Sequence, residues 1–165
     1  MDQIQTVGIP KYFSIYKLNN NFILNLLLYD TTSRENCKPY IETYYKKVDA
    51  IILVYDITNK ESFEECQNYF KSSLEEKSNI DTKVLLLGNK KDCEEQRQVT
   101  YKEAKEFADL NKYIFMEISC LEINSIYEAF KKIITEAALI KMKDENKNNS
   151  RIRKRNEQNS VCKNF

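Results

Sequence analysis

Three short apolar runs, separated by helical patterns, constrain the fold of this chain more than any other feature. Residues 50–55, 83–87 and 113–118 read AIILVY, KVLLL and YIFMEI. These nearly continuous apolar runs have the length of strands and lack the alternation that a strand with one wet face would show. They therefore predict strands covered on both faces, the type found in parallel sheets.

Amphipathic patterns follow these runs and predict helices between the strands. Apolar residues spaced three and four apart favour helices over residues 60–77, 100–110 and 123–142. The middle helix opens with Thr100 and Glu103, the residue pair of a capping box. Strands that alternate with helices in this way predict a doubly wound α/β fold with a mostly parallel sheet.

An antiparallel hairpin precedes the first of these strands. Residues 12–18 and 22–29 have the composition of strands, and the three asparagines between them tolerate the left-handed conformations of a turn. At the other end, apolar periodicity stops after Met142, and the last 25 residues hold eight Lys or Arg against three Asp or Glu. We therefore expect one domain over residues 1–142 and a disordered basic tail over residues 143–165.

The composition excludes several classes of function. A formal net charge of +1 gives no general attraction to nucleic acid. The chain has no histidine, which removes His-based catalytic triads and most zinc sites. Five scattered cysteines without a CxxC pair argue against a disulfide framework and indicate a reducing, cytoplasmic compartment. No apolar run reaches the roughly 18 residues that a transmembrane helix needs.

The residues that follow the second apolar run can recognise guanine. In an open, mostly parallel sheet, ligands bind at the carboxyl ends of the strands. The strand predicted over residues 83–87 is followed by Gly88 and then by an N-K-x-D motif made of Asn89, Lys90 and Asp92. A carboxylate can accept hydrogen bonds from both the N1–H and the exocyclic amine of guanine, which adenine does not offer. Because such a motif rarely falls by chance directly after a strand, we interpret it as functional.

Four stretches together resemble the Ras superfamily of small GTPases, and most closely its Rab branch. They are TVGIPKYFSIYKLNNNFILNLLLYDTTSRE, VDAIILVYDITNKESFEE, LLLGNKKD and EISCLEINSIYEAF. The resemblance as a whole covers residues 6 to about 142. The resemblance implies the small-GTPase fold, which is P-loop NTPase-like, and the binding of GTP or GDP with Mg²⁺.

By this resemblance, one group of residues is expected to bind the guanine base. In the family, the N-K-x-D residues contact the base, and a turn of small residues after the last strand supports it with backbone N–H groups. Cys120 stands where the family has alanine, and Leu121 replaces a lysine that packs at the base. The implied residues are Asn89, Lys90, Asp92, Ser119, Cys120 and Leu121.

Two further residues match the family's magnesium ligands. Thr6 matches the threonine of the first switch loop, which coordinates magnesium and senses the γ-phosphate. Asp30 matches the acidic residue of the second switch loop, which holds magnesium through water. Near Thr6, Pro10 stands where the family usually has an acidic residue.

The family's phosphate-binding loop, G-x-x-x-x-G-K-[ST], does not occur in these 165 residues, which hold only two glycines. In the family this loop lies upstream of Thr6, so the first strand and helix of the fold are expected to be missing. That strand would lie between the strands ending at Tyr29 and beginning at Ala50. Three explanations stay open: a fragment of a longer GTPase, a truncated relative that does not bind nucleotide, or a rearranged sheet.

The turn after Asp30 departs from the family at its catalytic position. It reads DTTSRE, against Asp-Thr-Ala-Gly-Gln-Glu in the family. Ser33 stands where a glycine amide contacts the γ-phosphate, and Arg34 where a glutamine orients the attacking water. Arginine has only hydrogen-bond donors and cannot hold that water in the same way. We therefore assign no catalytic residue and expect GTP hydrolysis to be impaired.

The resemblance also implies partners and a location. A Rab-like protein would be a guanine-nucleotide switch in vesicle or membrane traffic, with effector and regulator proteins bound through its switch regions. The alternative is a pseudo-GTPase that acts as a protein-interaction module. Cys162, behind a basic stretch, resembles a prenylation site, and an incidental cysteine in a basic tail is the alternative. We expect a monomer without a nucleic-acid partner, cytoplasmic or peripheral on the cytosolic face of endomembranes.

Overall fold

Strands and helices alternate along most of the chain. The computed structural model describes residues 10–19, 22–31, 48–69 and 82–161, with the backbone alone past residue 143. In chain order the elements are β1 (Lys11–Asn19), β2 (Phe22–Tyr29), β3 (Ala50–Asp56), α2 (Lys60–Tyr69), β4 (Lys83–Asn89), the 3-10 helix η3 (Lys91–Gln96), α3 (Tyr101–Leu110), β5 (Ile114–Glu117) and α4 (Ile123–Val161).

A parallel three-stranded sheet forms the centre of the fold. Its strand order is β3-β4-β5, and both neighbouring pairs are parallel. The register sets Tyr55 of β3 beside Gly88 of β4, which in turn lies beside Glu117 of β5. The three strands predicted from the apolar runs are therefore confirmed, and so is the α/β class of the fold.

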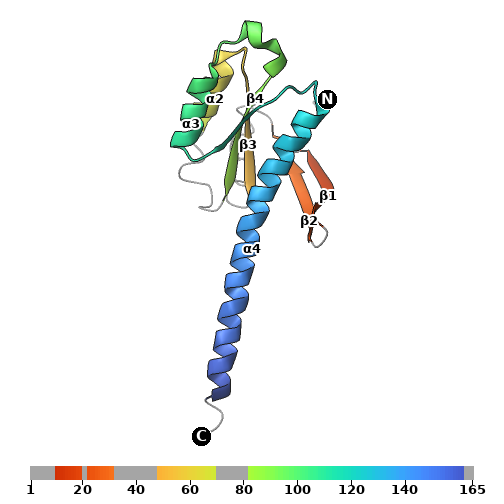
Figure 1. The fold of residues 1–165 in the computed structure, drawn as a ribbon, viewed down its shortest axis with the longest axis vertical. Coiled ribbons are helices and arrows are strands. Elements are labelled where there is room, and N and C mark those ends of the chain that lie inside the picture. The colour runs from red at the N-terminus through yellow and green to blue at the C-terminus, as the bar shows by residue number, and fades with distance from the viewer. Residues whose placement is uncertain (1–9, 20–21, 32–47, 70–81, 162–165) are drawn as a thin grey trace, which may run out of the picture.

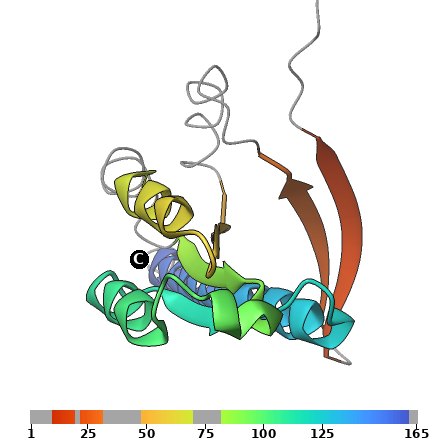
Figure 2. The ribbon, with the colours of Figure 1, turned by 90° about the horizontal axis from the view of Figure 1, so that it is seen from above.

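Helices cover both faces of this sheet, which explains why its strands are apolar throughout. On one face, α2 and α3 bury a cluster that includes Leu53, Phe63 and Ala104. On the other face, α4 packs against Leu85 and Leu87 (Figures 1 and 2). Residues 70–77 of the helix predicted over residues 60–77 lie outside the described residues. The helix is confirmed from Lys60 to Tyr69.

The predicted hairpin is confirmed, but it forms a sheet of its own. Strands β1 and β2 pair in antiparallel register, with Phe13 opposite Leu27. The hairpin lies beside the first turns of α4 (Figures 1 and 2), where Tyr16 hydrogen-bonds Tyr127. Among the described strands, no backbone ladder joins the hairpin to the parallel sheet. The absence of the first strand, which was expected between β2 and β3, stays a prediction.

Helix α4 is longer than the sequence pattern indicated. In place of the predicted disordered tail after Met142, the backbone stays helical to Val161 and extends away from the sheet (Figure 1). The reason is local, because no Gly or Pro interrupts this segment, and its three Lys, three Arg and two Glu form helices readily. None of the described helices is long and apolar enough to span a bilayer.

Candidate functional site

The candidate site is built at the carboxyl ends of the three parallel strands. Strands β3 and β4 end level with each other, because Asp56 pairs with Asn89 in the register. The chain then leaves β4 through Lys90 into η3, whose first turn carries Asp92. It leaves β5 through Ile118 into the turn that begins at Ser119. The topology thus brings two loops, 30 residues apart in the sequence, to one edge of the sheet.

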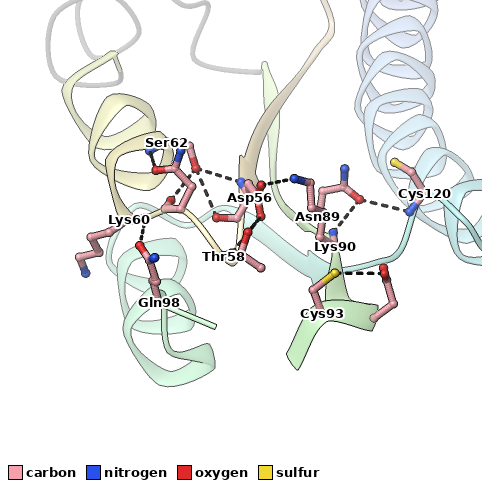
Figure 3. A network of polar contacts seen from close by, with 11 residues as sticks. Asp56, Thr58, Lys60, Ser62, Asn89, Lys90, Cys93, Gln98 and Cys120 are labelled. Carbon is pink, nitrogen blue, oxygen red and sulfur yellow. Dashed lines mark hydrogen bonds and ion pairs between the residues drawn. The ribbon is translucent and has the colours of Figure 1, made fainter. Parts of the chain in front are cut away.

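The Asn89 side chain joins these two loops (Figure 3). Its Oδ1 accepts hydrogen bonds from the Lys90 amide at 2.7 Å and from the Cys120 amide at 3.1 Å. A backbone bond of 3.0 Å from the Lys91 amide to the Ile118 carbonyl reinforces the connection. Asn89 therefore holds the two loops together through its side-chain amide.

Asp92 lies exposed at this edge with an ionised carboxylate. The hydroxyl of Ser119, which is itself buried, and the Cys93 thiol, 3.3 Å from Asp92 Oδ2, both donate hydrogen bonds to it. These donors hold the pKa of the Asp92 carboxyl below its usual value, with Ser119 as the larger cause. An ionised carboxylate at the surface is a strong hydrogen-bond acceptor for a ligand with two adjacent N–H groups.

Lys90 adopts an unusual backbone conformation and reaches across to β3. Its φ of 65° and ψ of 36° place it in the left-handed region, which non-glycine residues seldom occupy. The Lys90 Nζ lies 2.6 Å from Asp56 Oδ2. Asp56 was not among the residues predicted for the site. It directly follows the apolar run at 50–55, so the strand-end rule could have identified it.

A buried ion pair supports the site from behind and was also missed by sequence reasoning. The Arg97 guanidinium binds both carboxylate oxygens of Glu117 at 2.8 Å, and the Glu117 side chain is 3% exposed. Arg97 follows η3, and Glu117 ends β5, so the pair connects the two loops beneath the surface. The signal in the sequence was a glutamate inside an otherwise apolar strand, because a buried carboxylate requires a partner.

Not every predicted residue joins this cluster. The Leu121 side chain is 85% exposed, and its amide donates to Ser119 Oγ at 3.1 Å. Asp30 follows β2 in the hairpin sheet, and among the described residues no hydrogen bond or ion pair links it to the base cluster. Thr6, Ser33, Arg34 and Cys162 lie outside the described residues.

The described residues fit a guanine base better than they fit a metal ion. Asp92 offers two carboxylate oxygens at the surface, with its position fixed by Ser119. By contrast, no group of three Asp, Glu, Cys or His residues that could hold a metal ion occurs in the described part of the chain. Only Asp30 of the two predicted magnesium ligands can be placed.

Comparisons with known proteins agree with this arrangement. The pattern of the Ras family matches residues 1–139. Human Ras-related protein Rab-17 is 38% identical over 122 residues, which are 74% of this chain and 57% of that protein. The GTP-binding protein YPT1 of Saccharomyces cerevisiae is 35% identical over 163 residues, 96% of this chain and 75% of that protein.

A third relative extends the same picture. Ras-related protein rab-39 of Caenorhabditis elegans is 34% identical over 134 residues, 79% of this chain. The matched part spans 58% of rab-39, so this chain corresponds to little more than half of that relative and of the human one. The sheet, the strand-end motif and these matches together show that the chain belongs to the Ras family of small GTPases and is Rab-like within it.

Proposed function

We propose that this chain is a guanine-nucleotide-binding protein of the Rab type. The observation that carries the proposal is the cluster of Asn89, Lys90 and Asp92 at the carboxyl ends of β3 and β4, with the Ser119 turn beside it. The Asp92 carboxylate would accept the N1–H and exocyclic amine of guanine. The Lys90 stem would cover one face of the ring, and Asn89 would hold the two loops around it.

The phosphate side of the site is where the proposed activity is weakest. Arg34 in place of the water-orienting glutamine indicates that GTP, once bound, is hydrolysed slowly. With no G-x-x-x-x-G-K-[ST] motif in these residues, the base contacts supply most of the binding free energy. We therefore infer that the chain binds GTP or GDP and hydrolyses GTP slowly. Mg²⁺ would bind with the nucleotide only where further residues hold the ion.

The cellular role follows from the relatives. A Rab-like guanine-nucleotide switch would act in vesicle traffic and exchange effector and regulator proteins as its nucleotide changes. Prenylation of Cys162 together with the basic residues before it would give the two signals that stable anchoring to a cytosolic membrane surface requires.

The test is titration of the purified chain with GDP in the presence of Mg²⁺, followed by calorimetry and by the amide NMR signals of residues 89–92. We expect GDP but not ADP to bind. Asp92→Asn should weaken GDP binding and improve binding of XDP, because an amide can donate to the 2-oxo group that replaces the guanine amine. Equal binding of GDP and ADP, or none of either, would contradict the proposal.

A second candidate is a pseudo-GTPase that works as a protein-interaction module. One observation favours it: the face of the hairpin that carries Phe13, Ile15 and Ile23 leaves these side chains 81%, 74% and 68% exposed. The only charged residues on the two strands are Lys11 and Lys17, so this face fits an apolar partner surface rimmed by carboxylates. GDP binding with a Kd below about 1 μM would exclude this candidate.

A further inference from the structure

Asp56 ends β3 as a fixed carboxylate rather than a mobile surface charge. Its Oδ1 accepts hydrogen bonds from the Thr58 amide at 2.9 Å and the Thr58 hydroxyl at 2.7 Å. Its own amide donates to Ser62 Oγ at 3.0 Å, at the start of α2. Figure 3 shows that these bonds leave the second carboxylate oxygen directed toward the end of β4.

Lys90 delivers its ammonium group to that second oxygen. The Nζ–Oδ2 distance is 2.6 Å, and the Lys90 and Asp56 side chains are 53% and 23% exposed. Because β3 and β4 end level, the lysine stem must cross the edge of the sheet to reach Asp56 (Figure 3). The left-handed backbone of Lys90 directs the side chain along this path.

An exposed ion pair of this kind contributes little to stability. The ion pair has a larger effect on the orientation of the Lys90 side chain, since a lysine side chain has four rotatable bonds and many conformations in solution. Fixing Nζ at the end of β3 selects the conformations in which the apolar stem lies between Asn89 and Asp56. The stem is the part of Lys90 that would contact a bound base.

We propose that Asp56 is a positioning residue for guanine binding, which sets the Lys90 stem along the edge of the sheet where the base ring lies. This inference rests on the proposed function, in which the Asn89–Asp92 loop binds guanine. It adds a residue from β3 that contacts no nucleotide itself. Its contribution passes through Lys90 alone.

The first experiment uses Asp56→Asn, which keeps the shape of the side chain and an acceptor for Thr58 but removes the charge. GDP affinity, measured by amide NMR titration of the full chain, should fall about twofold to fivefold, the range expected for one exposed ion pair. The preference for GDP over XDP should stay the same, because Asp92 is untouched. The same substitution in a Lys90→Met background should have no further effect, since methionine keeps the apolar stem without the ammonium group.

A matched control lies just before the same strand. Asp49 precedes β3 and pairs with Lys141 at 2.7 Å, so Asp49→Asn breaks the same kind of pair at the opposite end of the sheet. It should leave GDP affinity unchanged. If Asp56→Asn has no more effect than this control, or if its effect adds fully to that of Lys90→Met, the positioning role is wrong and guanine binding stands.

A measurement without nucleotide tests the ion pair itself. Burial alone would raise the pKa of the Asp56 carboxyl, but the hydrogen bonds from Lys90 and then Thr58 hold it below its usual value. Lys90→Met should therefore raise this pKa, as followed by carboxyl ¹³C NMR. An unchanged pKa would overturn the proposal. Absence of any GDP binding by the unmodified chain would instead overturn the proposed function, and the role of Asp56 with it.

Discussion

At the scale of single residues, the three cysteines that the structure describes differ in their surroundings. Cys66 is buried in α2, where its thiol donates to the Val54 carbonyl at 3.4 Å and burial raises its pKa to about 11. Cys93 is bonded to Asp92, and this bond is the main reason that its pKa is raised. Cys120 is exposed in the turn after β5.

These surroundings predict an order of alkylation. The thiolate is the reactive form, so at about pH 8 only roughly one Cys66 thiol in a thousand is reactive, and it is also shielded from the reagent. Of these three described thiols, iodoacetamide should modify Cys120 first, Cys93 more slowly and Cys66 last, as read from peptide masses over time. Raising the pH should accelerate Cys93 and Cys66. In denaturant the three rates should converge, and rapid labelling of Cys66 in the folded chain would contradict the burial described above.

At the scale of elements, the start of α3 shows how a predicted motif was confirmed in part. Thr100 caps the helix, since its side chain accepts a hydrogen bond from the Glu103 amide at 3.2 Å. The Glu103 carboxylate does not complete a capping box, because it pairs with Lys60 at the start of α2. Glu103 thus gives up the local hydrogen bond of a capping box and instead forms an ion pair that connects α2 and α3 on the same face of the sheet.

Substitution of the capping residue Thr100 tests how much the cap stabilises α3. Thr100→Ala should lower the free energy of unfolding by about 1 kcal/mol, because the Glu103 amide loses its acceptor. Thr100→Ser keeps that acceptor and should stay within a few tenths of a kcal/mol of the unmodified chain. Urea denaturation followed by circular dichroism measures both. A loss of equal size for serine and alanine would mean that the threonine methyl group, and not the cap, carries the effect.

At the scale of the whole molecule, the parallel sheet is packed more completely than the hairpin. The parallel sheet has helices packed on both faces and includes fully buried residues such as Tyr55 and Leu86. The hairpin, by contrast, has one face with several apolar side chains in solvent and touches α4 through Tyr16 and Tyr127. An isolated two-stranded hairpin is at best marginally stable in water.

Hydrogen exchange should reveal this difference. Amides of β1 and β2 are expected to exchange through local opening, well before those of β4, which lies between two strands and beneath helices on both sides. Mass spectrometry of peptides from 11–29 and 83–89 would compare the two sheets within one sample. Equal protection would show that the hairpin and the parallel sheet unfold as one cooperative unit.

The sequence predicted those features that depend on local pattern. The apolar runs identified β3, β4 and β5, because burial on both faces leaves a continuous apolar run in the sequence. The asparagine turn identified the hairpin, because turn residues mark the place where the chain reverses. The position of Asp56 at a strand end could have been read from the sequence, but its pairing with Lys90, like that of Arg97 with Glu117, depends on strand register and loop geometry. The division into two sheets escaped prediction for the same reason. The helix beyond Met142 was missed because its propensity carries no apolar period.

The pair of Arg97 and Glu117 also limits how this chain can change over generations. Losing Arg97 alone leaves the Glu117 carboxylate buried without its charged partner, at a cost of about 3–5 kcal/mol, whereas after loss of Glu117 the Arg97 guanidinium keeps its ion pair with the exposed Glu94. The two positions are therefore coupled in one direction, since only the loss of Arg97 passes through a protein with an unpaired buried charge. A descendant of this chain that has lost Arg97 should also have lost Glu117, whereas loss of Glu117 with Arg97 kept should be tolerated more often.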